Sequence, residues 1–236
     1  MHKKKNIILS LLFILFPILA KGQISNVDWI LHLADSEGYG NVYLIDIEVD
    51  SIGNTYAAIN YTSNLTIPIL NKKMPQAPHV HALIIKIDKK GNPLWVHAFK
   101  SDYANGINDI SLTSNGDLLI TGFGDGLSCF PSIKNDTLKV GKEKEVHYQR
   151  FQGFYAARYS SDGERKWVQY FDCSWGQGIS IAANKKDEIY MTFYHGGNIF
   201  QNEILIDSFE NTRNYSYKNS IAKFDGNGNL QNIKNL

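Results

Sequence analysis

Two acidic residues stand at equivalent points of a recurring pattern, and acid–base chemistry is the first function they suggest. Asp46 and Asp109 lie 63 residues apart, each inside a short run of alternating apolar and polar residues. Paired carboxylates can act as general acid and base on a glycosidic bond, or bind a cation. The third copy of the pattern has Ser180 at this point. The sequence leaves open a second interpretation, in which the aspartates accept hydrogen bonds that tie neighbouring repeats together.

Other residues could bind a metal, but each set is incomplete. His79 and His81 would lie on one side of an extended segment, as two zinc ligands do, yet no third ligand is evident. His195 precedes two glycines, which is typical of a turn. The run from Asp225 to Asn229 has the rhythm of a calcium loop without its downstream glutamate, so a hairpin turn is expected. We therefore predict no catalytic, cofactor-binding or metal-binding residues.

A repeat supplies the elements that position these side chains. Trp29, Trp95 and Trp167 are separated by 66 and 72 residues. A basic residue that ends an apolar run and a turn glycine recur at similar steps. These residues are Lys86, Arg158 and Lys223, with Gly91, Gly163 and Gly228. The last copies depart from the pattern, with Asp187 in place of a turn glycine and Asn232 in place of tryptophan.

Each copy contains short, aromatic-rich runs of period two separated by Gly, Asn and Asp turns, which predicts four antiparallel strands. Radial repetition of such sheets is a β-propeller. The pattern Asp-x-x-Gly-Asn-x-Leu-Trp followed by Gly-Ile-Asn-Asp-Ile-Ser-Leu, in residues 88–122, resembles the bacterial SBBP-type β-propeller repeat family. The resemblance is diffuse and covers nearly the whole mature chain. It implies a propeller fold and an extracytoplasmic setting, and it carries no catalytic residues.

The predicted fold class is therefore all-β, a β-propeller-like array of four-stranded antiparallel blades. Three blades are expected over about residues 43–99, 106–171 and 178–236, with an extra outer strand over about 27–33. Closed propellers have about four to eight blades, and three would leave sheet edges exposed. Three explanations remain open: a fragment of a longer product, self-association that completes a ring, or an open three-blade array.

The N-terminus predicts secretion. Three lysines precede an apolar run that is too short for a comfortable membrane span, and small residues follow it, so we expect a signal peptide over residues 1–22 with cleavage after Gly22. The product would be secreted, periplasmic or on the cell surface, without a membrane span. The formal net charge of +1 excludes a general attraction to nucleic acid. In this setting Cys129 and Cys173, expected in loops on the same side, could form a disulfide or remain two separate thiols.

The connections between the second and third strands of each blade are long, over about 62–81, 124–153 and 195–218. Each contains an alternating run that could add a hairpin to the blade edge: residues 65–69, 137–140 and 203–206. Long loops on one face of a rigid scaffold are a common binding surface. We predict a non-catalytic binding module whose partner is a protein or a polysaccharide. The alternatives are a carbohydrate-active enzyme that uses Asp46 and Asp109, and a purely structural surface component.

Overall fold

The computed structural model describes residues 29–35, 40–62, 65–68, 72–74, 79–134, 136–141, 153–208 and 217–236. All of its strands belong to the unit Leu31–Leu236. Among the residues described, no helix is long and apolar enough to cross a membrane. The predicted signal peptide lies outside them.

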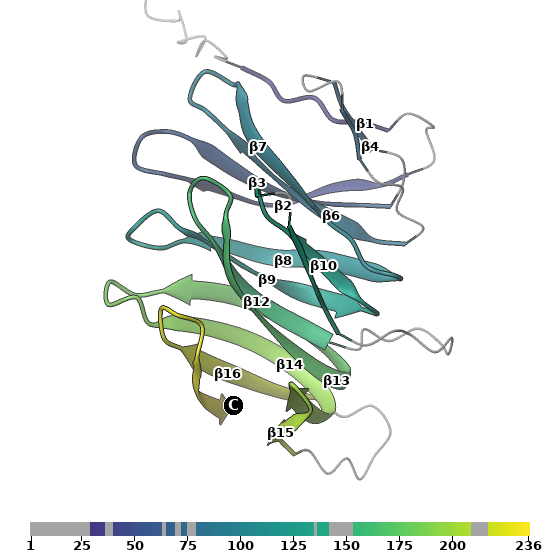
Figure 1. Cartoon of the computed structure of the whole chain (residues 1–236), viewed down its shortest axis with the longest axis vertical. Coiled ribbons are helices and arrows are strands. Elements are labelled where there is room, and N and C mark those ends of the chain that lie inside the picture. Colours follow the sequence, from purple (N-terminus) through teal and green to yellow (C-terminus); the bar gives the residue numbers. More distant parts are fainter. Residues whose placement is uncertain are drawn as a thin grey trace, which may run out of the picture. The chain divides into compact units, whose positions relative to one another are not determined.

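Three antiparallel blades follow one another along the chain (Figure 1). Blade one consists of β2 (Val42–Val49), β3 (Thr55–Tyr61), β6 (His81–Ile87) and β7 (Pro93–Phe99). Blade two consists of β8 (Ala104–Leu112), β9 (Leu118–Asp125), β12 (Gly153–Tyr159) and the first half of β13 (Arg165–Ala183). Blade three consists of the second half of β13, then β14 (Ile189–Gln201), β16 (Lys218–Phe224) and β17 (Leu230–Asn235). The all-β fold of four-stranded antiparallel blades is confirmed.

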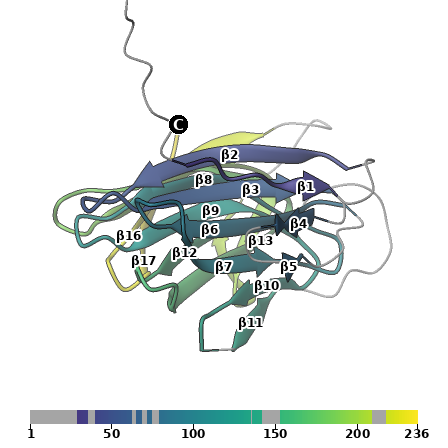
Figure 2. The same cartoon turned by 90° about the horizontal axis from the view of Figure 1, so that it is seen from above.

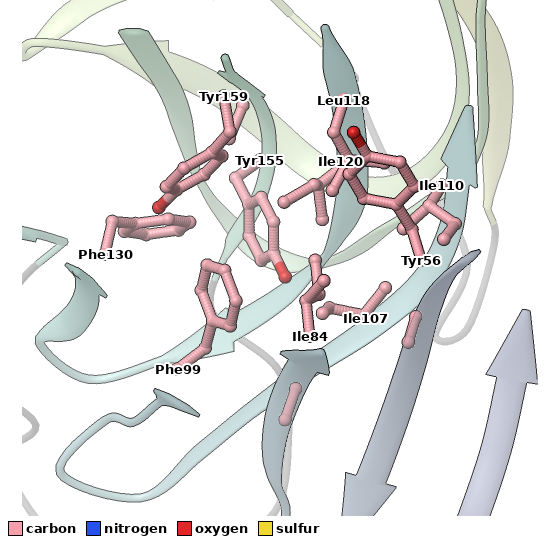
Figure 3. Close-up of a cluster of buried hydrophobic side chains, with 13 residues drawn as sticks. Tyr56, Ile84, Phe99, Ile107, Ile110, Leu118, Ile120, Phe130, Tyr155 and Tyr159 are labelled. Carbon is pink, nitrogen blue, oxygen red and sulfur yellow. The ribbon is translucent and has the colours of Figure 1, made fainter. Parts of the chain in front are cut away.

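Stacking of the blades explains why their middle strands are apolar on both faces. In β12 the side chains of Tyr155 and Ala157 enter a core shared with blade one, while Phe154 and Ala156 enter a core shared with blade three. Successive side chains of a strand point to opposite faces of its sheet. A middle strand of a blade that is covered on both faces is therefore apolar along most of its length. Figure 3 shows the first of these interblade cores, in which Tyr56 and Phe99 of blade one meet blade two.

The junction between blades two and three differs from the expected loop. Strand β13 runs without interruption from the outer edge of blade two to the inner edge of blade three. Register shifts between Cys173 and Trp175 and between Gly178 and Ser180 mark two irregularities along it. Bulges of this kind bend a strand and increase its twist, so one strand can serve two blades. Blades two and three therefore share a single sheet.

The extra outer strand expected around Trp29 is not formed at residues 29–33; residues 27 and 28 lie outside the described part of the chain. The first strand is instead the short β1 (Ala34–Asp35), which pairs with β4 (Leu65–Ile67). Strand β4 also pairs with β5 (Lys72–Lys73), and Leu65 and Ile67 are fully buried.

The long connections carry the added hairpins that their alternating sequences indicate. Besides β4 and β5, these are β10 (Ser128–Pro131) with β11 (Thr137–Val140), and β15 (Ile204–Asp207), which pairs with β14. Strand β10 lies against blade one, where Phe130 packs on Phe99. Viewed from above, the inner strands β2 and β8 lie along one side and β7 lies toward the other (Figure 2).

Candidate functional site

The two aspartates of the inner strands tie each blade to the next. The Asp46 Oδ2 atom accepts a hydrogen bond from the backbone N–H of Ile110 in blade two, at 3.2 Å. The Asp109 Oδ2 atom accepts two hydrogen bonds from blade three, from the backbone N–H of Ile181 and the hydroxyl of Ser180, both at 2.7 Å. Aspartates at equivalent positions of the repeat therefore make the same kind of contact at the two interblade boundaries. Of the two interpretations open from sequence, these contacts favour the hydrogen-bonding one.

Both aspartates belong to an acidic row on the inner strands. Burial raises the pKa of Asp109 above its ordinary value; the hydrogen bonds from Ile181 and Ser180 lower the pKa, and contact with Asp46 raises it again. Burial also raises the pKa of Glu48, with a contribution from the charges of Asp46 and Asp109. Like charges brought close together disfavour ionisation. The raised pKa values of Asp109 and Glu48 are a feature that also suits acid–base chemistry.

A second set of interblade contacts involves the basic residues of the repeat. Lys86 Nζ and Trp95 Nε1 of blade one both donate to the carbonyl oxygen of Ser161 in blade two, at 2.8 and 3.1 Å. Arg158 Nη1 and Trp167 Nε1 of blade two repeat the contact with a carbonyl of blade three, at 2.8 and 3.1 Å. That acceptor is the carbonyl oxygen of Gly226. The landmarks that define the repeat in the sequence are thus the residues that join its blades.

Arg158 has the larger set of partners. Its Nε donates to Asp117 at 2.8 Å within blade two, and its Nη1 donates to Asp187 of blade three at 2.7 Å. Asp187 occupies the turn position that glycine holds in the other copies, and it adopts the same left-handed backbone, with φ of 62°. Asparagine and aspartate tolerate this conformation better than most residues. The departure from glycine therefore supplies a carboxylate to the neighbouring arginine.

The histidines singled out in the sequence do not converge. His79 is exposed and its ring lies 3.7 Å from that of Tyr103, whereas His81 is buried beside Tyr61. His195 is also buried, with Nδ1 2.9 Å from the carbonyl oxygen of Gly197 and Nε2 3.7 Å from Asp207. Within the described ranges, no group of three or more His, Cys, Asp or Glu side chains is arranged to hold a metal ion.

The calcium-like run closes on itself as a hairpin turn between β16 and β17. The Asp225 carboxylate accepts hydrogen bonds from the backbone N–H groups of Asn227 and Asn229 and from the Asn229 side chain, at 2.8–3.0 Å. These bonds lower the pKa of Asp225, with the side chain of Asn229 contributing most. Asp88 is bonded in the same way by Lys90 and Asn92. Carboxylates engaged in this way favour the interpretation of this segment as a turn.

The two cysteines are separate free thiols, so the disulfide that the sequence allows is not formed. Cys129 lies in the predicted connection between the second and third strands of blade two, in its added hairpin, whereas Cys173 does not lie in a loop. Cys129 is in β10, in a bridge with Lys100, and Cys173 is inside the continuous strand β13. Burial raises the pKa of Cys129, and it raises that of Cys173 to about 12.

Thiol counting should distinguish two free cysteines from a disulfide. The protein unfolded without reductant should titrate with two thiols per chain, because both cysteines are free. The native protein should react slowly at Cys129 and scarcely at Cys173, since the thiolate is the reactive form and burial suppresses it. Ellman's reagent with and without denaturant measures both values. A count of zero in denaturant would mean that the cysteines are bonded.

The two ends of the blades differ in construction. At one end, short turns join the first two and the last two strands of each blade, and their Asp, Asn, Ser or Thr side chains bond within the turn. At the other end are the hairpins β4–β5 and β10–β11, strand β15 and the junction within β13. This end also carries half-exposed aromatic side chains, among them Trp175, Tyr194 and Tyr217. We call it the loop end.

Comparison with known proteins adds little to this description. No family model matches the chain, and no curated protein matches it. Among solved structures, it is similar to selenomethionine-substituted virginiamycin B lyase from Staphylococcus aureus. The two are 10% identical, the match covers 87% of this chain and 89% of the other, and the TM-score is 0.25. The strand order and register described above, rather than this match, establish the blade architecture.

Proposed function

We propose that this chain is a secreted, SBBP-type repeat protein that acts as a non-catalytic binding module through its loop end. The observation that carries the proposal is the contrast between the two ends of the blades. At the end with the short turns, polar side chains form hydrogen bonds within each turn. The loop end instead adds strands and half-exposed aromatic rings to the same scaffold. Rigid blades that present variable connections at one end are a common plan for recognition.

The alternative function is a carbohydrate-active enzyme that uses Asp46 and Asp109. The raised pKa of Asp109 favours it, because perturbed carboxyls gather at catalytic sites. The hydrogen bonds argue against it: Asp109 Oδ2 already accepts two bonds from blade three, and Asp46 Oδ2 accepts one from blade two. A carboxylate oxygen that already accepts bonds from the next blade is better suited to joining the blades than to transferring protons to a substrate.

Replacement of the aspartates separates the two functions. Asp46→Asn and Asp109→Asn keep an acceptor oxygen for the neighbouring blade and remove the charge, so both variants should fold and the double variant should bind as wild type does. Asp109→Ala should lose about 0.5–1.5 kcal/mol of stability per hydrogen bond, because the Ile181 N–H and the Ser180 hydroxyl lose their acceptor. Urea denaturation measures these differences.

The pH dependence has a definite sign. The pKa of Asp109 is higher in the folded protein than its ordinary value of 3.8, so the folded state binds the proton more tightly. Its contribution to stability is therefore present at low pH and lost as the pH rises from 3.8 through the folded pKa. Asp109→Asn should therefore gain stability relative to wild type as the pH rises above 3.8, which urea denaturation at a series of pH values measures.

Product analysis decides between binding and turnover. Wild-type protein incubated with soluble polysaccharides should release no reducing ends. Release that disappears in the Asp46→Asn, Asp109→Asn double variant, while its folded fraction is unchanged, would establish the enzyme and reject the binding module. A chain with no saturable ligand of any class would instead be a structural component.

A further inference from the structure

The outward face of blade three carries a different set of side chains from the faces that are buried between blades. Along β14 and β16, Met191, Phe193, Ala222 and Phe224 point into the second interblade core. Because side chains alternate, Tyr194 and Asn219, which are paired across β14 and β16, point away from blade two. This outward face occupies the place that a following blade would cover.

The face lacks the groups that join one blade to the next. Where blade two presents Phe154 and Trp167 to blade three, the repeat places Asn219 and Asn232 in blade three. Asp109 is replaced by Ser180, whose hydroxyl is already bonded back to blade two. Lys223, the counterpart of Arg158, is paired within its own blade with Glu188 at 2.6 Å. The interblade hydrogen bonds of Asp109 and Trp167 therefore have no counterpart at this face, and Lys223 is paired within blade three.

Three aromatic rings nevertheless gather on it, at the loop end. The rings of Trp175 and Tyr217 have centroids 3.9 Å apart, and Tyr194 lies 5.2 Å from Trp175 and 5.8 Å from Tyr217. They come from β13, β14 and the residue before β16. Tyr217 is 46% exposed and the other two rings are half-buried. Tyrosine and tryptophan placed in this way offer an apolar ring face together with a polar tip.

Uncharged amides border the rings. Gln177 and Asn219 are both paired with Tyr194, on its two sides in the sheet. The Gln177 Oε1 atom accepts a hydrogen bond from Asn108 at 3.3 Å, so its NH₂ group is the part of the amide that can donate to a ligand. Lys218, which follows Tyr217, is paired with Asp207 at 2.7 Å, and Lys223, at the far end of β16, is paired with Glu188. The exposed Lys234, in register with Ile221, lies farther along this face than the rings and amides. The surface therefore favours an uncharged ligand with both C–H and hydroxyl faces.

We propose that Trp175, Tyr194 and Tyr217 form a stacking platform for a neutral polysaccharide, with the Gln177 and Asn219 amides bonding its hydroxyl groups. A sugar ring presents axial C–H bonds to an aromatic face and equatorial hydroxyls to flanking amides, which is the combination found on this surface. The proposal rests on the proposed binding function and names its ligand and its site.

Retention on insoluble polysaccharide tests the platform. The full-length protein is passed over cellulose, chitin, starch and mannan, with polygalacturonate as an anionic comparison. Wild type should be retained by at least one of the four neutral polymers. Trp175→Ala and Tyr217→Ala should each weaken retention about tenfold or more, because each removes a stacking surface. Tyr217→Phe should bind almost as wild type does, since the ring face is kept.

The matched control is Tyr43→Ala, which removes an exposed aromatic ring of blade one, 53% exposed, without touching the platform. It should leave retention unchanged, and thermal melting of every variant checks the folded state. Retention by none of the neutral polymers overturns the platform, as does retention by polygalacturonate alone. Retention that Trp175→Ala and Tyr217→Ala leave unchanged also overturns it, although binding elsewhere on the loop end would then stand. Release of reducing ends would reject the proposed function itself.

Discussion

Arg158→Ala should lower the free energy of unfolding by about 3–5 kcal/mol, the largest effect we expect from one charged residue. The guanidinium is 5% exposed and bonds Asp117, Asp187 and the carbonyl oxygen of Gly226. Its removal leaves the buried Asp117 carboxylate with Lys166 as its remaining cation, at 2.5 Å. It also leaves Asp187 without its partner from blade two, and it leaves the Gly226 carbonyl with the Trp167 indole as its donor from blade two. Loss of one member of a buried ion pair costs far more than the pair itself contributes, because the other charge stays desolvated.

The repeat provides the control for this experiment. Lys223→Ala removes the equivalent basic residue of blade three, whose pair with Glu188 is about one-third exposed on both sides. Exposed pairs contribute at most about 1 kcal/mol, so this variant should unfold close to wild type. Arg158→Lys keeps the charge but cannot bond both carboxylates with a planar fork, and it should fall between the two. Urea denaturation measures the loss of unfolding free energy in each variant. Equal losses in Arg158→Ala and Lys223→Ala would mean that the bonds from Arg158 to blade three do not stabilise the protein measurably.

The sequence predicts the blades well because their determinants are local. Alternating apolar residues, turn chemistry at Asp50, Asp88 and Asp225, and the tryptophan spacing are all visible without knowledge of any contact. The contacts of Arg158 are not set by local sequence, because they depend on which turns of blade three pack against it. One signal was available in the sequence: Asp187 replaces the turn glycine in the copy that follows the only arginine among the three basic positions, Lys86, Arg158 and Lys223.

The continuous strand β13 shows where local reasoning fails. Gly176 and Gly178 suggest a loop, since glycine usually interrupts strands. In the structure both lie inside β13. Glycine is needed at these two positions because a larger side chain would meet its neighbours. A Cβ atom on Gly176 would lie 2.7 Å from the Cys173 sulfur, and one on Gly178 would lie 2.0 Å from Thr121 Oγ1. Glycine inside a strand often marks such close approach, but at Gly178 the approaching group, Thr121, comes from a distant part of the chain.

Gly228→Ala should lower the free energy of unfolding by about 2–4 kcal/mol, through two separate causes. The residue has φ of 84°, a left-handed conformation that costs an alanine about 1–2 kcal/mol. Its Cβ would also lie 2.6 Å from the Trp167 ring. That ring is packed against the second interblade core and stacks on Phe224, so it cannot withdraw freely. The clash would further disturb the turn whose Gly226 carbonyl holds Arg158 and Trp167.

Gly116→Ala isolates the first cause, because Gly116 has φ of 78° and no atom within 4 Å of the added Cβ. This control should lose only the backbone cost. A double-mutant cycle isolates the second cause. In a Trp167→Ala background the cost of Gly228→Ala should fall to that of Gly116→Ala, because the ring that the new methyl group meets is gone. If the cost stays the same without the indole, the tryptophan does not constrain this turn. The recurrence of glycine opposite Trp95 and Trp167 would then reflect backbone conformation alone.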